Sequence, residues 1–269
     1  IGLIEVVVID LKSNDDAYMI FETLNARGTP LLASDLIKNY ILQTASSKGM
    51  DTDKIYEEHW KDFENNWWRE DIRQGRLVRP RIDIFLNYWL VARKQEEVQS
   101  HEIFTSFRDY VEELGSDVLS IVKDIQHVGE TYRQLDRFDP HSPEGTFIYR
   151  WEIMQAGVAT PLLLQLFSAN KDQLSQERKE LCIKALESYL VRRMICRMTT
   201  KDYNRLVIEL IPKVAKNIQQ ADEILIKHLQ GQTSESRLWP NDEQVEKAVQ
   251  DLPLYRLLTR GRLRFVLES

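Results

Sequence analysis

The residues best suited to chemistry form a polar corner near the start of the chain. They offer amides, a guanidinium, an open backbone position and a carboxylate, in the order Asn25, Arg27, Gly28, Asp35 and Asn39. Because a guanidinium matches a phosphate group in geometry and charge, the corner is a candidate phosphate site. The competing interpretation is structural. A helix would end at Gly28, Pro30 would prevent its continuation, and Arg27 would pair with Asp35.

Searches for catalytic motifs assign no catalytic residue and no metal site in this chain. The nucleophile elbow Gly-x-Ser-x-Gly and the phosphate-cradling loop with its Gly-Lys-Ser/Thr end are both absent. The five histidines are scattered singly, without the i, i+4 spacing of a helical zinc site. Asp10-x-Lys12 is a weak nuclease-like pattern, since carboxylates hold Mg²⁺ and a lysine polarises the attack. A polar strand end that leads into a helix cap explains the same residues.

Arginines gather in three clusters although the net charge is −6, which argues against a protein that coats nucleic acid nonspecifically. Local arginine clusters are either phosphate-binding faces or solvated faces with ion pairs. The first cluster holds Arg69, Arg73, Arg76, Arg79 and Arg81, the second Arg192, Arg193, Arg197, Lys201 and Arg205, and the third Arg256, Arg260, Arg262 and Arg264. As candidate DNA contacts we take Arg69, Arg73, Arg76, Arg192 and Arg193.

The elements that must position these residues are helices. Apolar residues recur at helical spacing along most of the chain, which predicts a mainly α protein of nine or ten helices. One or two short N-terminal strands are expected, the first over residues 3–11. Ser34 or Asp35 is expected to cap the helix that follows the corner. Ser100 is expected to cap a helix that ends near residue 114, and Ser175 is expected to begin a long helix. Pro212 predicts a kink or a boundary.

The composition and the first residue of the chain lead to expectations about its compartment and about whether it is a fragment. No run of about 18 apolar residues is present, so we expect no membrane span. The two cysteines lack metal-ligand spacing and indicate a reduced, cytoplasmic compartment. The chain begins with Ile1 next to a predicted strand, so we expect a fragment of a longer protein.

A family resemblance rests on the corner and on the second arginine cluster. The stretch AYMIFETLNARGTPLLASDLIKNYIL carries Phe21, Glu22, Asn25, Gly28, Leu31, Asp35, Leu36 and Asn39 at matching positions. It resembles the signature of the GmrSD-like family of bacterial modification-dependent (type IV) restriction proteins, also grouped as domains of unknown function 262 and 1524. The stretch LESYLVRRMICRMTTKDYNRL, with Arg192 and Arg193, is similar to the helix that opens the family's second domain. LWPNDEQVEKAVQDLPLYR and RLRFVLES resemble the stretch before that domain's nuclease motif.

The resemblance implies an architecture and a function. A ParB-like domain hydrolyses nucleoside triphosphate through an Asp-Gly-Gln-Gln-Arg motif, and a His-Asn-His metal nuclease cuts foreign DNA. Neither motif is in this chain, so the nucleotide and the divalent metal are implied only for the full-length protein. We expect residues 1–48 to end the ParB-like domain, 49–140 to form a helical middle and 141–269 to lead into the nuclease.

Three functional hypotheses remain open from the sequence. The chain connects a nucleotide-hydrolysing domain to a nuclease and contacts DNA, with Asn25, Arg27, Gly28, Asp35 and Asn39 near the nucleotide site. Alternatively, it is a structural or protein-interaction helical domain that binds neither DNA nor nucleotide. A stand-alone enzyme that uses Asp10 and Lys12, or the corner itself, is the third. Whether the protein forms a homo-oligomer is left open as well.

Overall fold

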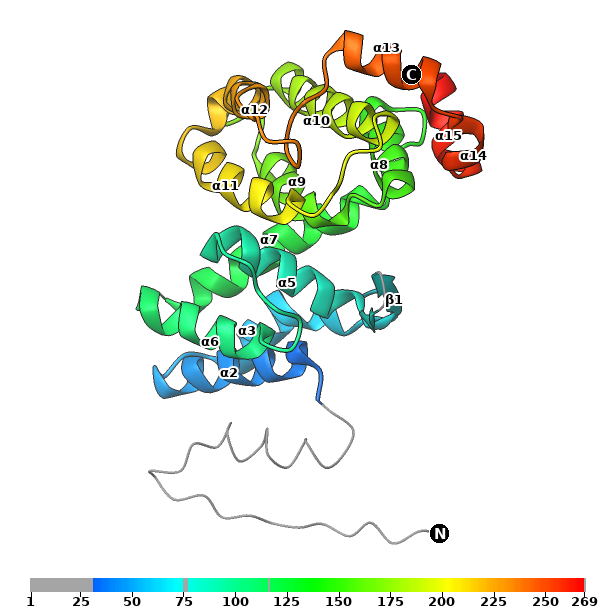
Figure 1. Ribbon diagram of the computed structural model, residues 1–269. Helices are drawn as coiled ribbons and strands as arrows, with labels where there is room; N and C mark the ends of the chain where they lie inside the picture. Colours follow the sequence, from blue (N-terminus) through cyan, green and yellow to red (C-terminus); the bar gives the residue numbers. More distant parts are fainter. Residues whose placement is uncertain (1–30, 75–76, 116, 269) are drawn as a thin grey trace, which may run out of the picture.

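The computed structural model describes residues 31–74, 77–115 and 117–268. The predicted strand over 3–11 and the corner residues before Leu31 lie outside these ranges. The mainly α prediction is confirmed, with 14 α-helices in the described part of the chain (Figure 1). The helices are α2 (Ala33–Ser47), α3 (Thr52–Ile55), α4 (Asn66–Arg69), α5 (Arg81–Lys94), α6 (Ile103–Leu114), α7 (Val118–Leu135), α8 (Pro143–Met154), α9 (Thr160–Ser168), α10 (Gln176–Ile195), α11 (Tyr203–Lys216), α12 (Ala221–Gln230), α13 (Asp242–Asp251), α14 (Leu254–Leu257) and α15 (Arg260–Glu268).

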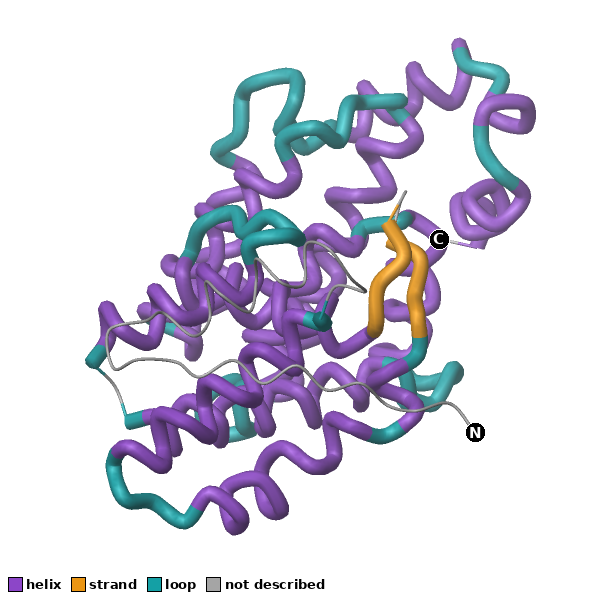
Figure 2. The backbone as a smooth tube through the Cα atoms, turned by 90° about the horizontal axis from the view of Figure 1, so that it is seen from below, coloured by secondary structure: helices purple, strands orange, loops and turns teal. Residues whose placement is uncertain are grey.

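A two-stranded antiparallel sheet interrupts the helices. β1 (Asp71–Gln74) pairs with β2 (Leu77–Pro80), and Ile72 lies opposite Arg79 (orange in Figure 2). This hairpin falls in the first arginine cluster, where no strand was expected.

The first hydrophobic core lies among α2 to α7. Its centre is a set of fully buried side chains from different helices, including Ile37, Phe85, Phe107 and Ile125. Because α2 contributes to this core, the expected division at residues 48 and 49 falls within one packing unit. The division at 140 and 141 falls in the loop between α7 and α8.

The second core is built by α8 to α12, and α9 joins it to the first. Leu162, Leu163 and Leu166 of α9 belong to the second core, whereas Leu164 belongs to the first. A helix that buries every face needs apolar residues all round, which explains the sequence TPLLLQLF.

A third, smaller cluster fixes the last helices. Leu254, Leu258 and Phe265 of the α14–α15 region pack against Val191 and Ile195 at the end of α10. The second and third arginine clusters are thereby brought to the same end of the molecule, where α14 and α15 lie beside α8 (Figure 1).

The helix caps differ in part from the expectation. Ser175 caps α10 as predicted, since its side chain accepts a hydrogen bond from the Arg178 N–H. The cap predicted for α2 is wrong. That helix has Leu32 at its N-cap, without a side-chain hydrogen bond, and the carboxylate of Asp83 on α5 accepts from the Ser34 N–H at 3.0 Å.

One further boundary also differs, since the residue before α6 is Glu102 rather than Ser100. Of the two alternatives for Pro212, the boundary is excluded because Pro212 lies inside α11, which continues to Lys216, and the kink stays a prediction. None of the described helices is long and apolar enough to cross a membrane.

Candidate functional site

Of the two corner residues that the structure describes, Asp35 is already paired. Asn39 is exposed on α2, and the Asp35 carboxylate accepts a hydrogen bond from Arg69 Nη2 at 2.8 Å. Asn25, Arg27 and Gly28 lie outside the described residues. The structure thus brings together a residue expected near a nucleotide, Asp35, and one expected to contact DNA, Arg69.

This pair belongs to a small network of charged residues beside the first two turns of α2. Lys38 and Tyr56 both donate to the Glu64 carboxylate, at 2.6 and 2.7 Å. Burial alone would raise the pKa of Glu64, but the hydrogen bonds from Lys38 and Tyr56 outweigh it and lower the pKa. The hydrogen bond to Asp35 raises the pKa of Arg69. These contacts join α2 to the segment around α4 and give Arg69 a structural role.

The other two candidates of the first cluster are not alike. Arg73 is exposed on β1, and no carboxylate lies within salt-bridge distance of it among residues 31–74, 77–115 and 117–268. Arg76 lies outside the described residues. The DNA contacts predicted for both remain predictions.

Arg193 is a fully buried side chain with no exposed surface. Its guanidinium donates to the carbonyl oxygens of Thr199 and Leu238 at 2.6 and 2.7 Å, and to that of Ser236 at 2.8 Å. Arg193 therefore fastens the loop after α12 to the end of α10. Its surroundings leave no guanidinium atom facing solvent where DNA would lie.

Arg192, its neighbour, points the other way. It is partly exposed, forms an ion pair with Asp242 at 2.6 Å and donates to the carbonyl of Pro240 at 3.1 Å. A DNA phosphate would have to displace the Asp242 carboxylate, which is itself 82% exposed.

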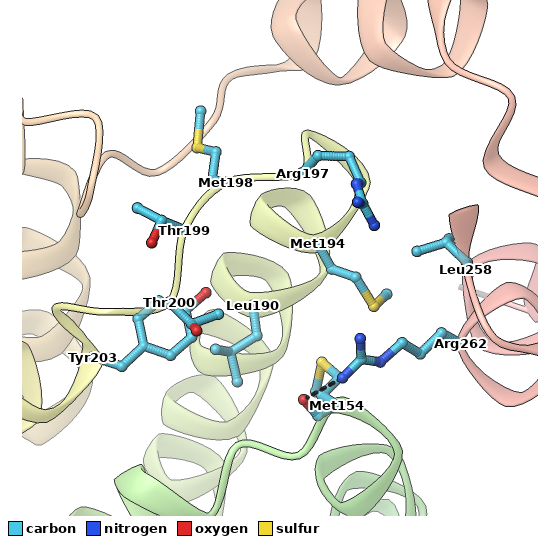
Figure 3. A pocket seen from close by; sticks show the side chains of 10 residues that line it. All are labelled: Met154, Leu190, Met194, Arg197, Met198, Thr199, Thr200, Tyr203, Leu258 and Arg262. Carbon is cyan, nitrogen blue, oxygen red and sulfur yellow. Dashed lines mark hydrogen bonds between the residues drawn. The ribbon is translucent and has the colours of Figure 1, made fainter.

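A basic cleft lies where the second and third arginine clusters meet. It has a volume of about 340 Å³, and its walls come from the ends of α8 and α10, the start of α11 and the α14–α15 region (Figure 3). Two arginines, Arg197 and Arg262, line it without any acidic residue. The other lining residues are Met154, Leu190, Met194, Met198, Thr199, Thr200, Tyr203 and Leu258.

Backbone geometry positions both arginines of the cleft. Arg197 has a φ of 56°, in the left-handed region, so the chain turns sharply at the end of α10. Its Nη1 donates to the Leu257 carbonyl at 3.4 Å. Arg262 donates from Nε and Nη2 to the carbonyls of Ile153 and Met154, each at 3.2 Å, and so holds α15 against the end of α8 (Figure 3).

Neither guanidinium is neutralised. Among the described residues, no carboxylate lies within salt-bridge distance of Arg197 or Arg262, and the same holds for the exposed Arg256 and Arg260. By contrast, arginines elsewhere on the molecule pair with acids, as Arg150 does with Glu187 and Arg237 with Glu209. The sequence had marked the clusters, but only the structure separates their paired members from these unpaired ones.

The cleft can bind an anion, and its residues show no feature of catalysis. Hydroxyls of Thr199 and Thr200 also line the cleft and can donate hydrogen bonds to an anion. Cys196 lies close by, but burial raises the pKa of its thiol, so the thiol is not activated. The described part of the chain has no group of three or more His, Cys, Asp or Glu placed to hold a metal ion.

Comparison with protein-family models, with curated proteins and with solved structures finds no match to this chain. The functional interpretation therefore depends on the site itself and on the resemblance described above.

Proposed function

We propose that this chain is the connecting part of a bacterial, cytoplasmic modification-dependent restriction protein, and that it contacts DNA phosphates through the basic cleft. In that role it would link a nucleotide-hydrolysing domain to a metal-dependent nuclease. The resemblance at residues 17–42 and 186–206 supports the family. The chain alone is expected neither to hydrolyse nucleotide nor to cut DNA.

The observation that carries the DNA contact is the unpaired state of Arg197 and Arg262 in a cleft without acidic residues. An arginine already paired with a carboxylate gains little from a phosphate, because one ion pair replaces another. Unpaired arginines have no such cost, and the exposed Arg256 and Arg260 extend the positive surface beyond the cleft. Thus the cleft replaces Arg69, Arg192 and Arg193 as the proposed centre of contact.

Binding of a fluorescent duplex, with and without modified bases, measured across a salt series, tests this function. We expect log affinity to fall linearly with log salt, with a slope of about −0.9 for each phosphate neutralised. A preference for modified bases would place recognition in this part of the protein. If no binding occurs at low salt, the DNA-contact proposal fails.

One observation favours a second candidate, a helical domain that only supports or joins other proteins. Arg69, Arg192 and Arg193, three of the five arginines first chosen, serve contacts within the fold. On this interpretation the duplex does not bind, either to the wild-type chain or to variants of the cleft arginines.

A further inference from the structure

A second cavity, separate from the basic cleft, lies between the two large cores. It has a volume of about 790 Å³, within the usual range for small-molecule sites. Its walls come from β1, α5, α7, α8 and the start of α9. Because α5 and α7 belong to the first core and α8 and α9 largely to the second, a ligand here would contact both.

Aromatic side chains form the inner wall. Tyr88, Tyr132 and Trp151 line the cavity, and Tyr88 and Trp151 are 9% and 5% exposed. Tyr132 packs against Tyr88 with ring centroids 6.3 Å apart. Such a wall suits an apolar or aromatic body, and the ring faces attract a cation.

Two carboxylates, Asp136 and Glu152, stand at the mouth. Both line the cavity and are exposed, and neither has a salt-bridge partner in the described ranges 31–74, 77–115 and 117–268. Both belong to the lining of one cavity, and burial first, and then the negative charge of Asp136, raise the pKa of Glu152. Burial first, and then neighbouring charges that include Asp136 and Glu152, raise the pKa of Tyr132, an effect that Arg81 opposes.

The charged residues that line the cavity are two carboxylates and one arginine, Arg73 on β1, so their summed charge is negative. A cationic group placed between Asp136 and Glu152 would relieve their repulsion and lie against aromatic rings, whereas an anion would be repelled.

From this arrangement we infer that the cavity between the cores binds a small organic cation, an alkylammonium or guanidinium group on an apolar or aromatic body. The cation is held by Asp136 and Glu152, and the body lies against Tyr88, Tyr132 and Trp151. This inference is independent of DNA binding at the basic cleft.

The test uses three probes of equal shape and different charge, titrated into the full chain by calorimetry and ligand-detected NMR. They are 2-phenylethylammonium, the neutral 2-phenylethanol and the anionic 3-phenylpropionate. We expect the ammonium probe to bind, and the neutral and anionic probes to bind at least about tenfold more weakly. Binding should also raise the unfolding temperature, because the ligand contacts both cores.

Matched variants locate the site. The double substitution Asp136→Asn and Glu152→Gln should lower the affinity for the ammonium probe at least about tenfold. The control double substitution Glu130→Gln and Glu177→Gln removes the same charge from exposed positions outside the cavity and should leave binding unchanged. Equal binding of all three probes, equal loss in both double variants, or no binding of the ammonium probe would overturn the inference.

Discussion

At the scale of single residues, two adjacent arginines have opposite roles. Sequence spacing cannot separate Arg192 from Arg193, because both lie in the last turn of the same amphipathic helix. Burial separates them, since one side chain reaches a solvent-exposed acid and the other reaches carbonyl groups of a loop more than 40 residues away.

We expect Arg193→Lys to destabilise the fold by roughly 3–5 kcal/mol, because several buried carbonyl oxygens lose a charged donor and a lysine cannot reach them all. Arg192→Lys should cost about 1 kcal/mol or less, as is usual for an exposed ion pair. Urea unfolding followed by circular dichroism measures both. Equal losses in the two variants would contradict the structural role of Arg193.

A second residue-scale prediction concerns pH. Burial first, and then the neighbouring charge of Lys213, lower the pKa of His228. Lys213 Nζ lies 2.9 Å from His228 Nδ1, and it can donate there only while that nitrogen carries no proton. The unfolded chain therefore binds this proton more tightly than the folded protein does.

The free energy of unfolding should therefore contain the whole contribution of neutral His228 above the ordinary histidine pKa of about 6.5. This contribution should be lost as the pH drops through and below that value. His228→Gln should flatten the pH dependence between pH 5 and 7. His101→Gln, at a histidine whose side chain is 77% exposed, should not. If the slope of unfolding free energy against pH is the same in the His228 variant as in the wild type, His228 is not the source of that slope.

At the scale of elements, the start of α2 depends on a residue far along the chain. The Asp83 side chain lies at 3.0 Å from the Ser34 N–H and at 3.3 Å from that of Ala33, and it is 7% exposed. Burial raises the pKa of Asp83, which the hydrogen bonds from Ser34 and Ala33 oppose.

We expect Asp83→Ala to cost about 1–2 kcal/mol, the usual loss for an N-terminal capping acceptor, and to increase hydrogen exchange at the first amides of α2. Asp83→Asn keeps an acceptor oxygen and avoids a buried charge, so its loss should be smaller. Thermal unfolding and amide exchange compare the two. If the Asn variant loses as much unfolding free energy as the Ala variant, a neutral acceptor oxygen does not stabilise the N-terminus of α2.

The elements themselves were largely predictable, and the exceptions have physical causes. Ser175 is a local signal, so the beginning of α10 was predicted from the sequence. The apolar run of α9 is a local signal of the same kind, since it agrees with the burial of that helix. The cap of α2 comes from a residue 49 positions away, and no local pattern encodes it. The hairpin has one local signal, the pair Gly75-Arg76 between two short segments. This signal is weak because Asp71–Gln74 and Leu77–Pro80 do not alternate regularly between apolar and polar residues.

At the scale of the whole molecule, tertiary packing determines which arginines pair with a carboxylate and which do not. The sequence located three arginine clusters, but it could not say that Arg69 pairs with Asp35, or that α14 and α15 place Arg262 beside Arg197. These contacts join residues tens of positions apart, and they follow from which apolar faces meet. The basic cleft is thus a product of tertiary structure.

The central claim, that DNA phosphates contact the cleft, is tested most directly by the salt slope of duplex binding in two matched variants. One carries Arg197→Asn, Arg256→Gln and Arg260→Gln; Asn tolerates the left-handed conformation at 197, so the fold should be kept. The other carries Arg137→Gln, Lys171→Gln and Lys184→Gln, which remove the same charge from exposed positions outside the cleft. We predict that the first variant loses about one unit of slope for each phosphate contact removed, and that the second keeps the wild-type slope. Equal slopes in the two variants would contradict the claim.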